Sequence, residues 1–154
     1  MYKSVRLTKI VKGLYIHPYT MRYTIVDHTA DVMVRCTGGT LEECFENAAY
    51  ALFDQMVDVS QVDPIMSVDI DVSGDDYESK LYAFLSELLF IQDSEMIILS
   101  DFKVRFDDGK VKCIAYGEPL DPSKHRVKGE IKAITYHMLS VDENEPSLTV
   151  IFDV

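Results

Sequence analysis

The chain has 154 residues, a length typical of a single domain. It contains no apolar run of about 18 residues, so the sequence predicts no membrane-spanning helix and no membrane partner. The 26 acidic and 15 basic side chains give a net charge of −11. Because such a surface repels a phosphate backbone, direct non-specific binding of nucleic acid is disfavoured, whereas metal cations and basic proteins are favoured as partners.

The charge is unevenly distributed along the chain. Residues 1–20 contain four basic side chains and no acidic one, so residues 21–154 carry all 26 acidic and the remaining 11 basic side chains, a net charge of −15. We expect residues 1–20 to be a basic extension outside the fold, or alternatively an ordinary N-terminal strand. We expect residues 21–154 to form one domain.

The cysteines indicate the redox environment. There are three of them, Cys36, Cys44 and Cys113, and no two form a Cys-x-x-Cys pair. This pattern disfavours a disulfide framework and a thiolate zinc site, and it fits a reducing cytoplasm. Residues 1–20 also lack the apolar region and the small-residue cleavage site of a secretory signal. We therefore expect a cytoplasmic protein whose cysteines lie in the core.

The first clear element is an amphipathic helix that begins after Thr40. Thr40 and Glu43 form a capping box, with Thr40 at the N-cap and Glu43 at the third helical position. Apolar residues then recur at helical spacing as far as Met56, whereas Glu46 and Asn47 fall off this stripe. A second helix is predicted from about Asp76 to Ile91. With one apolar stripe each, both helices are expected to cover a sheet face on one side and contact water on the other.

The remaining segments alternate between apolar and polar residues or end at turn signals, as strands do. Strands are predicted at 22–26, 31–37, 66–72, 102–106, 111–117, 131–141 and 148–154. Short turns join several of them, which favours antiparallel pairing. The predicted fold class is therefore α+β, a two-layer sandwich of a mostly antiparallel sheet of about six to seven strands with two helices on one face.

Three groups of residues could carry chemistry. The first places Asp27, His28 and Asp31 at a short break between strands, where they form either a cation site or a simple turn. The second places Asp153 at the end of an apolar strand, next to Val154, where adjacent anionic groups need a positive partner such as a cation or Lys132.

The third group is a basic cluster around Lys124, Arg126 and Lys128, which is either a weak candidate for a partner surface or a solvated strand edge. Common enzyme signatures are missing: there is no phosphate-binding loop, no dinucleotide fingerprint, no nucleophile elbow and no zinc-protease motif. The sequence therefore assigns no catalytic residue.

Taken together, the segments resemble the archease family over residues 21–154. The resemblance is carried by four segments: His28-Thr29-Ala30-Asp31, the run from Thr40 to Ala49, the run from Lys132 to His137, and Val150-Ile151-Phe152-Asp153-Val154. It implies an elaborated SHS2-like domain. It also implies an activator of an RtcB-type tRNA-splicing ligase that promotes ligase guanylylation and multiple turnover, broadens nucleotide use and is not itself an enzyme. Contact with tRNA would be indirect, through the ligase.

The resemblance further implies a metal site formed by Asp31, Asp153 and Val154, the last through a main-chain or terminal carboxylate oxygen. The family pattern often ends in Asp-Ile where this chain has Asp-Val. A set of hard oxygen ligands suits calcium best, and also magnesium or manganese. His28 and Lys132 are the expected functional neighbours, although Lys132 could instead neutralise the aspartates in a salt bridge.

Two other functions remain open from the sequence. The chain could be a small metal-dependent phosphohydrolase, although the missing phosphate loop disfavours this interpretation. It could also be a chaperone-like modulator of RNA-processing enzymes.

Overall fold

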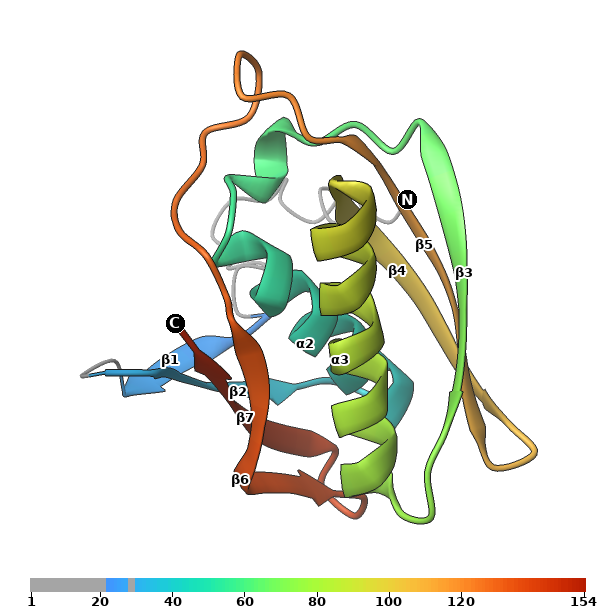
Figure 1. Cartoon of the computed structure of the whole chain (residues 1–154). Helices are drawn as coiled ribbons and strands as arrows, with labels where there is room; N and C mark the ends of the chain where they lie inside the picture. Colours follow the sequence, from blue (N-terminus) through green and yellow to red (C-terminus); the bar gives the residue numbers. More distant parts are fainter. Residues whose placement is uncertain (1–21, 28–29) are drawn as a thin grey trace, which may run out of the picture.

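The computed structural model describes residues 22–27 and 30–154, so His28 and the expected extension at residues 1–20 lie outside the described residues. The described strands are all antiparallel and form two sheets (Figure 1). The four-stranded sheet has the order β1-β2-β7-β6, formed by Thr24–Asp27, Val32–Thr37, Ser147–Asp153 and Ala133–Asp142. The three-stranded sheet has the order β3-β5-β4, formed by Met66–Ser73, Lys110–Pro119 and Ile97–Asp107.

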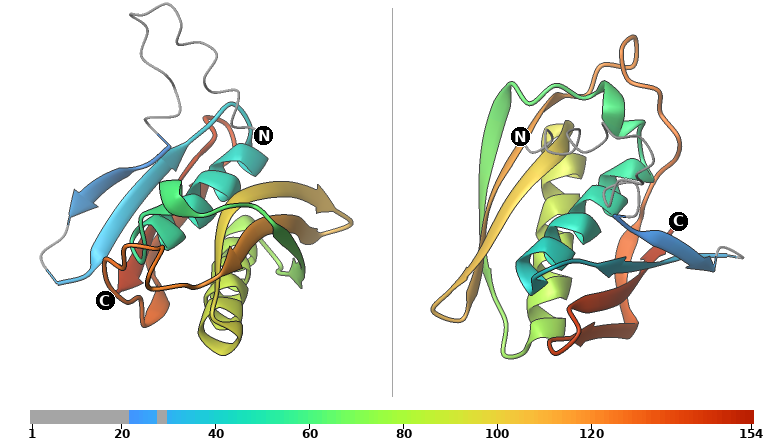
Figure 2. Two further views of the ribbon diagram at one scale, coloured as in Figure 1. Left: turned by 90° about the horizontal axis from the view of Figure 1, so that it is seen from above. Right: turned by 180° about the vertical axis from the view of Figure 1, so that it is seen from behind.

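Two helices lie between these sheets, as the views in Figure 2 show. Helix α2 (Leu41–Asp54) packs against β2 and β4, and helix α3 (Tyr77–Glu95) packs against β3 and β6. The short 3-10 helix η3 (Val59–Gln61) follows α2. The structure thus confirms the α+β class, the antiparallel pairing and the two amphipathic helices, and it divides the seven strands between two sheets.

Both helices begin where the sequence predicts. Thr40 Oγ1 accepts the backbone N–H of Glu43 at 3.1 Å, as in a capping box. The second bond of the box differs, because Glu43 Oε1 accepts the N–H of Gly39 at 2.6 Å instead of the N–H of Thr40. Asp76 caps α3 by accepting the N–H of Ser79 at 2.8 Å. Helix α3 extends to Glu95, four residues beyond the predicted end.

The expectation that α2 would contact water on its polar side holds for Glu43, which is exposed, and partly for Glu42 and Glu46, but not for Asn47. Asn47, which falls off the apolar stripe, is only 6% exposed. Its Nδ2 donates to the carbonyl oxygen of Thr37 at 2.8 Å, and its Oδ1 accepts from Arg22 Nε at 3.0 Å. The physical reason is that α2 lies between two sheets, so a second face of the helix is covered and its polar group has protein partners instead of water.

Aromatic side chains connect the helices to the three-stranded sheet. The ring of Phe45 contacts those of Phe84 and Phe106 at centroid distances of 5.9 and 5.0 Å, and Phe53 stacks on Phe102 at 5.9 Å. Such offset and edge contacts add to the free energy gained from apolar burial. Val32, at the start of β2, and Phe152, near the end of β7, belong to the same buried core and adjoin the candidate site.

Candidate metal centre

The pairing of β2 with β7 brings Asp31 close to Asp153. In this antiparallel pair Val32 lies opposite Phe152, and the register continues without a shift along the strands. Asp31, one residue before Val32, is therefore aligned with Asp153. Val32 and Phe152 face the buried core, so by alternation Asp153, within β7, projects from the other face of the sheet, and Asp31 precedes β2 as an exposed residue. Two carboxylates from distant parts of the sequence thus share one place on the surface.

Lys132 adjoins these aspartates through its backbone. Its N–H donates to the carbonyl oxygen of Asp153 at 2.7 Å, and the next residue, Ala133, pairs with Asp153 across β6 and β7. Lys132 also lines a groove against α3. Among the described residues, its Nζ makes no ion pair with either aspartate, so the alternative role of a neutralising salt bridge is not seen there.

The donor set fits a hard cation only if the main chain contributes. Within the described residues, no group of three or more His, Cys, Asp or Glu side chains could hold a metal ion. The candidate set is therefore two carboxylates, Asp31 and Asp153, with an oxygen of Val154 as the third ligand. Asp31 is exposed and Asp153 is half-buried, which leaves room for water ligands. Oxygen-only, partly hydrated sites suit calcium, magnesium or manganese.

The basic cluster predicted near residues 124–128 is largely occupied by internal ion pairs. Lys124 Nζ lies 2.6 Å from Asp63 Oδ2 and 2.7 Å from Glu118 Oε2. Lys128 Nζ lies 3.5 Å from Asp54 Oδ1. Both lysines therefore hold a long loop against the body, which makes them weaker candidates for a partner surface.

A buried polar network beneath this loop has no signal in the sequence analysis. Glu118, which is 7% exposed, accepts from His125 Nε2 at 2.8 Å and from the N–H of Asp63 at 2.9 Å. His125 Nδ1 accepts the N–H of Asp121 at 2.9 Å, so its proton is on Nε2. Burial alone would raise the pKa of Glu118, but the bonds from Lys124, Asp63 and His125 outweigh it and lower the pKa to about 2.

The network could have been noticed only as a glutamate near the end of a strand and a histidine seven residues later, in the loop that follows. Periodicity does not mark such a pair, because its members are brought together by the loop and not by a helix or strand. The network fixes the path of the chain from β5 to Lys132, and its two central groups, Glu118 and His125, are buried.

The cysteines lie in the core, as predicted. Cys36, Cys44 and Cys113 are all free and buried. Burial raises the pKa of Cys44 to about 11 and that of Cys113 to about 12. Since the thiolate is the nucleophile, these thiols are unreactive near neutral pH.

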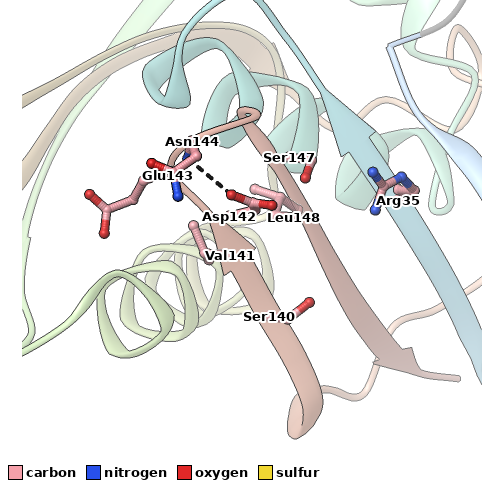
Figure 3. Close-up of a pocket in the computed structure, with 8 residues that line it drawn as sticks. All are labelled: Arg35, Ser140, Val141, Asp142, Glu143, Asn144, Ser147 and Leu148. Atoms are coloured by element: carbon pink, nitrogen blue, oxygen red, sulfur yellow. Dashed lines mark hydrogen bonds between the residues drawn. The ribbon is translucent and has the colours of Figure 1, made fainter.

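A surface pocket of about 580 Å³ lies at the other end of β7, between the β6–β7 turn and Arg35 (Figure 3). Within the β6–β7 turn, Asp142 Oδ1 accepts the N–H groups of Asn144 and Glu145 at 2.9 and 3.2 Å. Asp142 therefore stabilises its own turn. The pocket lies at Ser147, where β7 begins, whereas Asp153 is at the end of that strand, so this pocket is not part of the candidate metal centre.

Neither helix of the described residues is long and apolar enough to span a bilayer. Residues 23–154 match the Archease protein family (MTH1598/TM1083). Protein archease of Pyrococcus furiosus is 48% identical over 120 residues, which cover 75% of this chain and 84% of that protein.

Two solved structures have the same fold. The solution structure of protein 1598 of Methanobacterium thermoautotrophicum superposes with a TM-score of 0.75 at 36% identity, covering 86% of this chain and 99% of that one. A crystal structure from Thermotoga maritima, described as an archease and possible chaperone, has a TM-score of 0.56 at 17% identity, covering 85% of this chain and 96% of that one. The match over residues 23–154 and the identity to the Pyrococcus protein place the chain in a known family: it belongs to the archeases.

Proposed function

We propose that this chain is a protein activator of an RtcB-type tRNA-splicing ligase and not itself an enzyme. In this proposal it promotes guanylylation of the ligase, sustains multiple turnover and broadens the nucleotides that the ligase uses. Membership of the archease family supports the role. The observation that carries the proposal is the alignment of Asp31 with Asp153 across β2 and β7, beside the backbone of Lys132.

Asp31, Asp153 and an oxygen of Val154 would hold a divalent cation, with calcium favoured and magnesium or manganese as alternatives. Bound there, the cation would supply positive charge next to nucleotide phosphates handled by the ligase. By strand alternation Asp153 projects from the face of the sheet that the helices do not cover, and Asp31 is exposed, so a partner can approach both carboxylates. Lys132 would add a second positive charge near the same edge.

The charge of the chain supports a role that acts through the ligase. Residues 21–154 carry a net charge of −15, and two lysines of the predicted basic cluster are engaged in ion pairs. Such a surface does not attract an RNA backbone. We therefore expect tRNA to be contacted only through the ligase, in the cytoplasm where that enzyme works.

A multiple-turnover RNA ligation assay tests the proposal. A fixed amount of an RtcB-type ligase is supplied with RNA ends, nucleotide and metal, with or without the chain, and guanylylated ligase is quantified in parallel. We expect wild type to raise both turnover and guanylylation, and Asp31→Asn and Asp153→Asn to abolish most of the increase. Glu143→Gln, which removes one exposed carboxylate at the other end of β7, is the matched control.

If wild type left turnover and guanylylation unchanged, the proposed role would be wrong. If Asp153→Asn activated the ligase as well as the control did, the metal centre would not be the active part of the molecule.

A chaperone-like function is the second candidate, because the Thermotoga structure is described as a possible chaperone. It predicts that the chain suppresses aggregation of unrelated unfolded proteins, and that the aspartate variants do so equally well. A phosphohydrolase would instead release phosphate from nucleotides without any ligase. Both measurements use the same purified protein as the ligation assay.

A further inference from the structure

A groove of about 430 Å³ runs between α3 and the start of β6. Its helix side is formed by Tyr82, Ser86 and Phe90, which recur every four residues and so lie on one face of α3. Its other side is formed by residues 130–134, including Lys132 and Ala133. Figure 1 shows β6 passing alongside α3, and the two elements are in contact.

The groove exposes aromatic surface that the fold does not use. Phe90 is 64% exposed and Tyr82 is 37% exposed. The ring of Tyr82 lies 5.2 Å from that of Tyr136, and Tyr136 Oη lies 3.2 Å from Ser79 Oγ, so the tyrosines are held in place before any partner arrives. Neighbouring exposed aromatic side chains that are already positioned are typical of protein interfaces.

The charges along the groove indicate what fits it. Asp93 and Glu130 line it on opposite sides, and among the described residues neither side chain forms an ion pair. Two carboxylates against one lysine disfavour a phosphate-bearing ligand. The net charge of −11 likewise disfavours a second copy of this chain. A protein segment with an apolar side chain beside a lysine or arginine satisfies both the aromatic surface and the carboxylates.

We propose that this groove, which we call the α3–β6 groove, docks such an apolar and basic segment of the partner ligase. The inference rests on the proposed function and adds the docking surface to it. Ala133, which lines the groove, pairs with Asp153 in the neighbouring strand β7, so the groove lies one strand away from the candidate metal centre, on the helix-covered side of the sheet. Docking in the groove would therefore set the position of the ligase relative to Asp153, without chemistry of its own.

Titration of the chain against a fixed amount of ligase separates docking from activation. In the multiple-turnover assay, the concentration for half-maximal activation reports docking, and the plateau reports the metal centre. We expect Phe90→Ser to raise the half-maximal concentration about tenfold or more and to leave the plateau unchanged. Glu130→Lys should also raise the half-maximal concentration, and the increase should be larger at low salt. Asp153→Asn should instead lower the plateau.

The matched control is Ile114→Ser. Ile114 is 43% exposed on the outer face of the three-stranded sheet, away from α3. Its substitution removes an exposed apolar side chain, as Phe90→Ser does, but outside the groove. Circular dichroism and thermal unfolding verify that each variant is folded, which the exposure of Phe90 and Ile114 leads us to expect.

Three results would overturn the inference. The first is an unchanged half-maximal concentration for Phe90→Ser. The second is a lower half-maximal concentration after deletion of residues 1–20, which would show that this chain's own basic segment occupies the groove. The third is a dimer in sedimentation that Phe90→Ser dissociates. If wild type did not activate the ligase at all, the proposed function would fail, whereas direct binding of wild type and Phe90→Ser to the ligase would still test the groove.

Discussion

Asp31 and Asp153 are 122 positions apart in the sequence, yet the in-register pairing of Val32 with Phe152 aligns them across β2 and β7. Like charges directly opposite each other on a sheet are destabilising. A fold that places two carboxylates in this way is therefore prepared for a cation, and this relationship leads to the first prediction.

Calcium should stabilise the wild-type protein against thermal unfolding, because a ligand that binds only the folded state adds to its stability. At a concentration 100 times the dissociation constant the gain is about 2.7 kcal/mol. In Asp153→Asn this gain should disappear. With the metal chelated, the same variant should be as stable as wild type or more stable by up to about 1 kcal/mol, since repulsion is relieved. Differential scanning calorimetry measures both effects, and a calcium response retained by Asp153→Asn would contradict the prediction.

The buried carboxylate of Glu118 should make the fold sensitive to acid. Its pKa in the folded protein, about 2, is below the value of about 4.3 for an unfolded chain. Its contribution to stability is therefore complete above about pH 4.3 and is lost as the pH falls toward 2. Glu118→Gln should be destabilised at pH 7 by about 1–3 kcal/mol and should lose this part of the pH dependence.

Urea unfolding of Glu118→Gln at pH 7, 5, 4 and 3 tests this expectation, with the exposed-site variant Glu143→Gln as the control. Parallel pH profiles for wild type and Glu118→Gln would show that other groups determine the acid response.

Gly117 should tolerate no side chain. It pairs with Leu99 in β4 and with Met66 in β3, and a Cβ atom placed there would lie 1.9 Å from the carbonyl oxygen of Ile98. That neighbour is backbone and cannot turn aside, so Gly117→Ala must displace β4 from β5. We expect poor expression or a clear fall in melting temperature. Gly129→Ala is the control, because its Cβ would lie 3.7 Å from its nearest neighbour.

Asn47→Ala should destabilise the protein by about 1–3 kcal/mol, because it removes two part-buried hydrogen bonds, one to the carbonyl oxygen of Thr37 and one from Arg22. A substitution at an ordinary helix position outside the apolar stripe typically changes the free energy of unfolding by no more than about 0.5 kcal/mol. Glu42→Ala, on the same helix, provides that comparison. Chemical denaturation of both variants measures the difference, and equal stabilities would show that Asn47 has no structural role.

The elements that repeat with a local period could be predicted from the sequence. The caps of α2 and α3 depend on residues within four positions of each other, and the structure has cap hydrogen bonds at Thr40 and Asp76, where the two helices were predicted to begin. The hairpin turn at Asp108 and Gly109 was also predictable, since both residues adopt the positive φ angles, 54° and 76°, that the Asp-Gly pair favours.

What the sequence could not provide are relationships set by tertiary packing. Asn47 is buried because α2 lies between two sheets, and no local sequence pattern indicates that the strands divide into two sheets. The Glu118–His125 pair is likewise brought together by a loop. For the candidate site, the resemblance named Asp31, Asp153 and Lys132, but only the structure shows that the aspartates are aligned by the strand register and that Lys132 lines the α3–β6 groove.

The position of β7 has a consequence for how the molecule is made. β7 is the last of the described strands along the chain, yet it lies between β2 and β6 in the sheet. During synthesis β3, α3, β4 and β5 all emerge before β7 and can pack with one another, whereas β2, which emerges earlier still, pairs with β7 only after all of them have been made. Such non-local pairing closes slowly. The edge that carries Asp31 and Asp153 is thus assembled only when the rest is in place, so the ability to hold a cation there would report a fully folded molecule.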